Sequence, residues 1–155
     1  MALTLVASVG AAAGASHGAP KVVCHVSGGL QDSACTPGAI FRNASTADVC
    51  RPGYAGSVRN VPESVKRAVY AEYGIAGSHH GSAYEVDHLI SLELGGSNSI
   101  ANLWPEAATP KPGFREKDVV ENLLHRQVCD GTISLRTAQR LIRHNWLKVF
   151  RAIGR

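Results

Sequence analysis

The feature that most constrains this chain is the density of turn-forming pairs between residues 21 and 62. Gly28-Gly29, Pro37-Gly38 and Pro52-Gly53 interrupt this stretch. Glycine and proline at such spacing leave room only for turns and short extended pieces. A segment with so little apolar material of its own needs covalent bridges to stay closed. We therefore expect a turn-rich N-terminal segment that is stapled by disulfides.

The cysteines are the candidates for those bridges, and they are Cys24, Cys35, Cys50 and Cys129. Their spacing is too irregular for a zinc knuckle, which needs two close cysteine pairs. An even number favours two disulfides, with buried free thiols as the alternative, and three pairings are open. We favour a Cys35–Cys50 bridge, because both residues lie in the turn-rich segment.

The N-terminus predicts export. Residues 1–15 carry no charge and are rich in Ala, Val and Leu, and Ala13-Gly14-Ala15 before Ser16 has the small-residue form of a signal-peptidase site. No basic residue precedes the apolar run, so a flexible apolar tail is the alternative for residues 1–20. We therefore expect a secreted or periplasmic protein. No other apolar stretch is long enough to span a membrane, so the mature protein should be soluble. We also expect it to be a monomer.

The length of 155 residues, of which 45% are hydrophobic and 18% charged, fits one ordered domain and excludes a disordered or fibrous chain. We divide it into residues 1–20, residues 21–74 (the turn-rich segment and a helix) and residues 75–155. Apolar residues at helical spacing predict the first helix over about 62–73, before Gly74.

The last part alternates between strand and helix patterns. Residues 84–90 predict a strand that ends close to His88, and residues 102–104 predict a second short strand that Pro105 closes. Between them, Gly95-Gly96 forces a tight loop. A helix follows over 114–128, and its predicted buried stripe consists of Val119, Leu123, Leu124 and Val128.

The final predicted helix is basic on one side. It begins at an N-cap, Ser134, and continues to about Phe150. Residues 136–155 include no acidic residue, and the whole chain has a net charge of +4. Because the apolar residues of this helix face inwards, Arg140 and Arg143 are the candidate contacts for a phosphate backbone, with a solvated basic face as the alternative.

The order of these motifs resembles the HNH (His-Me finger) endonucleases, and in particular a small exported bacterial subgroup. The matching pieces cover about residues 30 to 150; they are Cys35–Ala39, Cys50–Tyr54, Asp87–Gly96, Asn102–Glu106, Lys117-Asp118, Glu121-Asn122, Leu124–Cys129, Ala138-Gln139 and Trp146. The resemblance implies an α+β fold with a ββα-metal core and flanking helices. It also implies a divalent-metal-dependent nuclease.

Roles for individual residues follow from the resemblance and from the chemistry. A water attacking a phosphodiester needs a base, and a histidine such as His88 titrates near neutral pH. The resemblance makes Asp87 a metal ligand and Asn102 the residue that ties down the loop. Many HNH proteins hold the metal with a third His or Asn on the helix, and the candidate positions here carry Lys117, Asp118, Glu121 and Asn122. Asp118 is our first candidate and Glu121 our second.

The expected cofactor is Mg²⁺, with Mn²⁺ or Zn²⁺ as alternatives, and the expected partner is nucleic acid, with DNA favoured over RNA. Two other functions stay open. The chain could be a catalytically inactive, disulfide-stapled module that binds nucleic acid, or an interaction domain that keeps only the scaffold. Asp118 could also simply pair with Lys117 or Arg115 on a solvated helix face.

Overall fold

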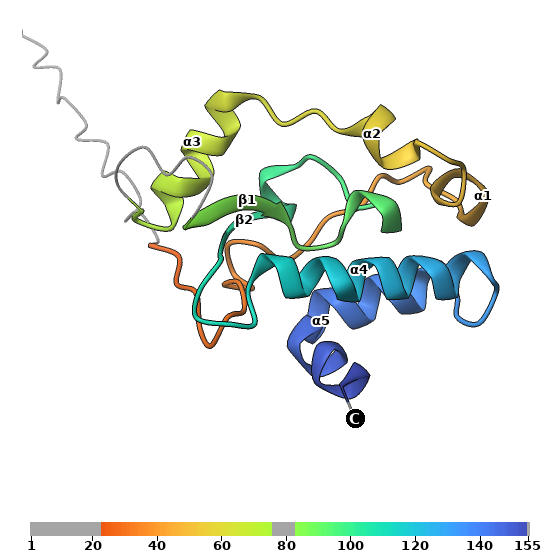
Figure 1. Cartoon of the computed structure of the whole chain (residues 1–155). Coiled ribbons are helices and arrows are strands. Elements are labelled where there is room, and N and C mark those ends of the chain that lie inside the picture. Colours follow the sequence, from red (N-terminus) through yellow and green to blue (C-terminus); the bar gives the residue numbers. More distant parts are fainter. Residues whose placement is uncertain (1–22, 76–82, 155) are drawn as a thin grey trace, which may run out of the picture.

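The computed structural model describes residues 23–75 and 83–154, so the predicted signal peptide lies outside the described residues. The fold is α+β, as the sequence predicts: a small antiparallel sheet lies between helix α3 on one side and the helix pair α4 and α5 on the other (Figure 1). The helices of the described part are α1 (Thr46–Val49), α2 (Tyr54–Val58), α3 (Glu63–Glu72), α4 (Phe114–Cys129) and α5 (Leu135–Ile153).

The sheet consists of β1 (Tyr84–His88) and β2 (Leu103–Ala107), with Asp87 opposite Trp104. The first strand ends at His88, as predicted. The prediction that Pro105 closes the second strand was wrong, because β2 continues through it to Ala107. Both strands of a two-stranded sheet are edges, and an edge strand tolerates proline where the missing N–H would face away from its partner.

The connection between the strands is a compact loop with two short 3-10 helices, η1 (Leu92–Leu94) and η2 (Ile100–Asn102). Gly95 ends η1 with a positive φ of 76°, a conformation that favours glycine. At Gly96 a Cβ atom would meet the carbonyl oxygen of Ile90 at 1.7 Å. The predicted Gly-Gly loop therefore has a physical reason at each position.

The two long helices provide most of the core. Helix α4 begins and ends within one residue of its predicted bounds, and Ser134 caps α5 by accepting a hydrogen bond from the Thr137 amide. The predicted stripe of α4 was partly wrong, because Val119 is 47% exposed while Val120 is fully buried. One packed cluster joins these helices to the loop; it contains Val49, Tyr54, Ile90, Leu94, Val120, Leu124, Val128, Ala138, Ile142, Trp146 and Leu147.

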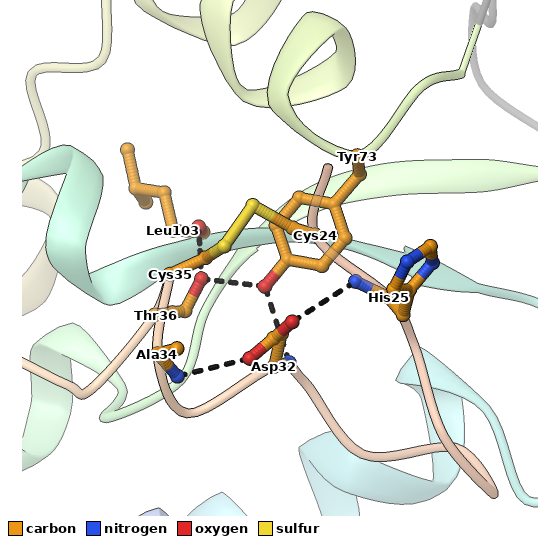
Figure 2. Close-up of a disulfide and its surroundings, with 8 residues drawn as sticks. All are labelled: Cys24, His25, Asp32, Ala34, Cys35, Thr36, Tyr73 and Leu103. Atoms are coloured by element: carbon orange, nitrogen blue, oxygen red, sulfur yellow. Dashed lines mark hydrogen bonds between the residues drawn. A yellow bond between two sulfur atoms is a disulfide. The ribbon is translucent and has the colours of Figure 1, made fainter. Parts of the chain in front are cut away.

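The N-terminal segment packs against the end of α3 (Figure 2). The Thr36 hydroxyl lies 2.7 Å from the Tyr73 hydroxyl and donates to the Leu103 carbonyl oxygen at 3.1 Å. A disulfide between Cys24 and Cys35 closes this loop. The segment is therefore attached to both α3 and β2.

The predicted Cys35–Cys50 disulfide was wrong. The pairs are Cys24–Cys35 and Cys50–Cys129, and the described chain has no free cysteine. Cys50 caps α1, a short helix that the turn signals did not predict, and this helix lies at the C-terminal end of α4. The second bridge thus ties the N-terminal segment to the long helices. Two disulfides indicate an oxidising, non-cytosolic environment.

Candidate functional site

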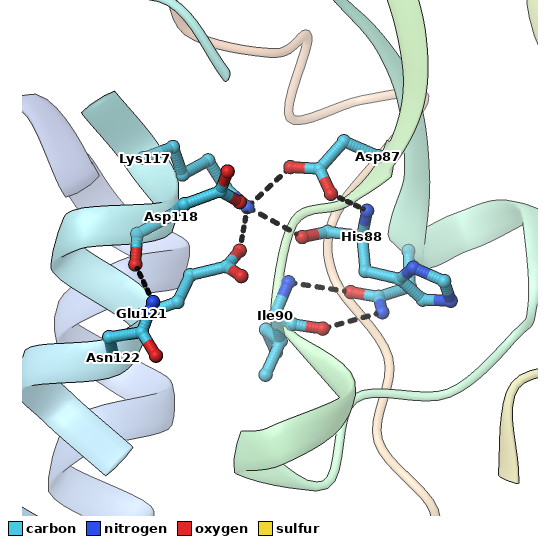
Figure 3. Close-up of polar contacts among 8 residues, drawn as sticks. Asp87, His88, Ile90, Lys117, Asp118, Glu121 and Asn122 are labelled. Carbon is cyan, nitrogen blue, oxygen red and sulfur yellow. Dashed lines mark hydrogen bonds and ion pairs between the residues drawn. The ribbon is translucent and has the colours of Figure 1, made fainter. Parts of the chain in front are cut away.

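The last two residues of β1 point to opposite sides of the strand (Figure 3). The carboxylate of Asp87 faces helix α4, and the imidazole of His88 faces away from it. This alternation follows from the period of two in a β-strand. Strand β1 therefore separates the candidate base from the carboxylates that α4 contributes.

His88 is buried, with 3% of its surface exposed. Its Nε2 atom lies 3.1 Å from the Asn98 Oδ1 atom, and Asn98 Nδ2 donates to the Val58 carbonyl oxygen at 2.7 Å. Since that second bond orients the Asn98 amide, its oxygen faces the ring and His88 must donate from Nε2. Nδ1 is then the unprotonated nitrogen of the neutral ring.

The surroundings of His88 favour this neutral form. Burial lowers the pKa of His88 below its usual 6.5, although Asn98 and Asp87 act in the opposite direction. The Arg59 guanidinium, in the connection between α2 and α3, lowers this pKa further. His88 is therefore an unprotonated base at neutral pH.

The hydrogen bonds of the Asn102 side chain within the described residues go to the backbone and not to the His88 ring. Asn102 is fully buried, and its side chain bonds to the Ile90 amide and carbonyl at 3.0 Å each, to the Ser97 carbonyl at 2.9 Å and to the Ala39 amide at 3.3 Å. These bonds close the loop that follows His88 and attach the N-terminal segment to it. The geometry is what a residue that ties down the loop requires.

Lys117, on α4, is the central residue on the side of β1 that faces this helix. It is completely buried, and its ammonium donates to Asp87 Oδ2 at 2.5 Å, to the His88 carbonyl oxygen at 2.8 Å and to Glu121 Oε1. Burial alone would lower the pKa of Lys117, but the neighbouring carboxylates outweigh it and raise that pKa. Lys117 is therefore a permanent cation that joins α4 to the end of β1.

Three largely buried carboxyl groups, those of Asp87, Glu106 and Glu121, surround the single Lys117 ammonium, so one cation cannot balance all three in their ionised form. Glu106 is 1% exposed, and its carboxyl can hydrogen-bond to Asp87 only when Glu106 is protonated, because two carboxylates are both acceptors. Burial raises the pKa values of Glu106 and Glu121 despite the Lys117 ammonium. Burial would also raise the pKa of Asp87, but there the ammonium outweighs burial and lowers it. The cluster accordingly favours uptake of protons or of another cation.

Two further carboxylates lie at the edge of this cluster. Burial, together with repulsion from Asp87 and Asp118, raises the pKa of Glu85 to about 7. Burial and Asp87 also raise the pKa of Asp118, whose side chain is exposed. The carboxylates of Glu85 and Asp118 accept no hydrogen bond from the described residues, so their oxygens are available to a ligand.

These donors fit a divalent cation at the outer edge of the cluster. Mg²⁺ binds carboxylate oxygens, usually one or two together with water. Asp118 is open, whereas Asp87 accepts from Lys117 with one oxygen and from the His88 amide with the other, and Glu121 has one oxygen on Lys117. Of the predicted metal ligands, the structure brings Asp87 and Glu121 together through the ammonium and leaves Asp118 as the most accessible.

The predicted nucleic-acid contacts lie in a separate groove of about 800 Å³ between α5 and residues 38–46. Arg136, Arg140, Arg143 and His144 line it, together with Ser45 and Thr46, and its lining includes no acidic residue. None of the three arginines forms an ion pair within the described ranges. His88 is not part of this groove, but the Asn102 bonds connect the loop after His88 to its wall at Ala39.

A third group with potential metal ligands lies at the far end of α4. The ligand atoms of Cys50, His125 and Cys129 are all within 4.8 Å of one another, so this group could hold a metal ion if the disulfide were open. The Nδ1 atom of His125 lies 3.4 Å from Glu93 Oε2. Glu121, which stands four residues before His125 on α4, bonds to Lys117.

Sequence reasoning missed the roles of Lys117, Asn98, Glu85 and Glu106. Lys117 had a usable signal, since it precedes Glu121 by four residues and could reach it on one helix face. Glu85 also had one, because it stands two positions before Asp87 and shares its side of the strand. Asn98 and Glu106 gave no signal, because their positions depend on the loop and on the strand register.

Comparisons of the chain with protein-family models, with curated proteins and with solved structures gave no match. Among the described residues, no helix is both long enough and apolar enough to cross a membrane.

Proposed function

We propose that this protein is a metal-dependent endonuclease that hydrolyses nucleic-acid phosphodiester bonds, with His88 as the general base. One observation carries the proposal: Asn98 holds the His88 ring neutral at the end of β1, one residue after Asp87, whose carboxylate faces α4 on the other side of the strand. A base with a lowered pKa at the same strand end as a set of hard oxygen ligands suits hydrolysis of an anionic diester.

In this proposal His88 removes the proton from the attacking water through Nδ1, because Nε2 already donates to Asn98. Asn98 keeps the ring in that tautomer, and Asn102 keeps the following loop in place. Arg59 is the nearby cation that would attract a phosphate towards the ring. Lys117 does not reach the substrate, since it is fully buried; its role is to hold Asp87.

Asp118 and Asp87 would hold the divalent cation, with Glu85 beside them and Glu121 largely engaged by Lys117. When bound, such a cation stabilises the charge on the departing oxygen of the diester. The order β1, glycine loop, β2 and α4 is the arrangement expected for a ββα-metal core, and we propose that this part of the chain is one.

The test is cleavage of plasmid DNA and of a structured RNA by the full chain, with and without EDTA. We expect cleavage that EDTA abolishes and that added Mg²⁺ or Mn²⁺ restores. Activity that survives complete chelation would exclude the metal from the proposal. No cleavage of either substrate with any of these metals would contradict the enzymatic function.

A catalytically inactive module that binds nucleic acid is the second candidate. The groove of unpaired arginines favours it, because such a groove attracts a phosphate backbone whether or not cleavage follows. Salt-dependent DNA binding without hydrolysis in any metal would support this candidate.

A further inference from the structure

Three ligand-bearing side chains gather where α1 meets the C-terminal end of α4. His125 and Cys129 stand four residues apart on one face of α4, and Cys50 follows α1. Lys117 precedes Cys129 by twelve positions, which is about 18 Å along the helix. This group is therefore separate from the proposed catalytic site.

The spacing of His125 and Cys129 suits zinc. His125 Nε2 lies 3.4 Å from Cys129 Sγ. With Zn–S bonds of about 2.3 Å and Zn–N bonds of about 2.0 to 2.1 Å, two ligand atoms on a tetrahedral zinc are about 3.5 to 3.8 Å apart. Two thiolates and an imidazole select Zn²⁺ over Mg²⁺, which prefers oxygen ligands.

In the structure the two sulfurs are bonded to each other, so neither has a thiolate charge for a metal. We infer that Cys50, His125 and Cys129 form a redox-controlled zinc site: when a dithiol opens this disulfide, Zn²⁺ replaces the S–S bond and keeps α1 joined to α4. The inference does not depend on the proposed nuclease function.

Reduction of the disulfide comes first, and zinc binding follows it. The dithiol gives two electrons and two protons to the S–S bond; this yields two cysteine thiols and leaves the dithiol as a cyclic disulfide. Zn²⁺ then binds both sulfurs as thiolates, and two protons are released. Water completes a site with three protein ligands.

The contacts of His125 prepare it for this role. In the disulfide form its Nε2 donates to the Val49 carbonyl oxygen at 2.9 Å. In the zinc form the ring proton moves to Nδ1, which faces Glu93, and Nε2 binds the metal. A carboxylate that holds the second nitrogen of a metal-binding histidine is the usual arrangement.

The two disulfides differ in access. Cys129 is exposed, whereas Cys24 is only 3% exposed. A dithiol should therefore open Cys50–Cys129 before Cys24–Cys35. The bond that lies beside a histidine ligand is thus the one that a reductant reaches first.

The experiment uses the untagged full chain, reduced anaerobically with dithiothreitol until mass analysis after alkylation shows one open disulfide, and then desalted. Zn²⁺ binding is measured by competition with a chromogenic chelator, and Co²⁺ is used as a spectroscopic probe. We expect one Zn²⁺ per reduced chain, release of two protons, a thiolate-to-cobalt absorption band and a higher melting temperature with zinc. The oxidised chain should show none of these.

His125→Ala should weaken zinc binding at least tenfold, and Glu93→Gln about 10- to 100-fold. His144→Ala, an exposed histidine on α5, is the matched control and should change nothing. Cys50→Ser/Cys129→Ser, which needs no reduction, should fold and gain no stability from zinc. Equal zinc binding by the oxidised chain, no binding by the reduced chain, or full binding by His125→Ala would each overturn the inference.

Discussion

Replacing Lys117 by methionine should destabilise the protein strongly. The substitution keeps most of the side-chain volume but removes the ammonium that bonds to Asp87, Glu121 and the His88 carbonyl oxygen. Removing one partner of a buried ion pair costs about 3 to 5 kcal/mol. At about 2 to 4 °C per kcal/mol for a chain of this size, the melting temperature should fall by about 6 to 20 °C.

The deficit of Lys117→Met, meaning its loss of unfolding free energy relative to the wild type, should depend on pH. In the wild type burial would raise the pKa of Asp87, but the Lys117 ammonium outweighs burial and lowers it; without the ammonium, burial raises the pKa of Asp87. A carboxyl with a lowered folded-state pKa contributes stability above its unfolded pKa of about 3.9, whereas one with a raised folded-state pKa loses stability as the pH rises above that value. The deficit should therefore be small near pH 4 and large near pH 8.

The assay is urea unfolding of wild type and variants across this pH range. Lys111→Met is the matched control, since the Lys111 side chain is 71% exposed and its pair with Glu116 lies at the surface. Its effect should stay below about 1 kcal/mol. A Lys117→Met deficit that equals the control at pH 8, or that does not change with pH, would refute the role of Lys117.

Three further predictions concern the base, the metal and the groove. Because burial lowers the pKa of His88 and the base acts unprotonated, the acidic limb of kcat/KM should lie below pH 6.5; a limb above it would contradict the assigned environment. Asp118→Ala should raise the Mg²⁺ concentration needed for activity more than Glu121→Ala does, and a metal titration that gives the reverse order would favour Glu121 as the ligand. Arg140→Gln/Arg143→Gln should flatten the slope of log affinity against log salt for uncleaved duplex DNA by about one unit per contact; an unchanged slope in EDTA would mean that the groove is solvated surface.

The sequence predicted local structure better than it predicted contacts between distant segments. The end of β1 at His88 and the N-cap of α5 at Ser134 follow from local residue preferences, and both were confirmed. The disulfide pairing was wrong because it depends on α1, a short helix that carries Cys50 to the end of α4. Sequence proximity made Cys35 and Cys50 look like partners.

The candidate site shows the same division. Asp87, His88 and Asn102 could be singled out from the order of motifs, because they stand at strand and loop boundaries. The position of Lys117 between two carboxylates could not be, because it results from how α4 packs against β1. That packing also decides which of the predicted carboxylates stays open to a metal.

The central claim is that His88 is the base of a phosphodiester hydrolysis, and single-turnover cleavage of a labelled DNA by folded His88→Ala protein at saturating Mg²⁺ tests it most directly. Loss of a positioned base should lower the rate by about 10²-fold or more, and added imidazole should restore part of it by entering the space that the ring leaves. His25→Ala, which changes an exposed histidine of the N-terminal segment, should cleave at the wild-type rate. Cleavage by His88→Ala at the wild-type rate would contradict the claim, as would a slow rate that imidazole does not raise.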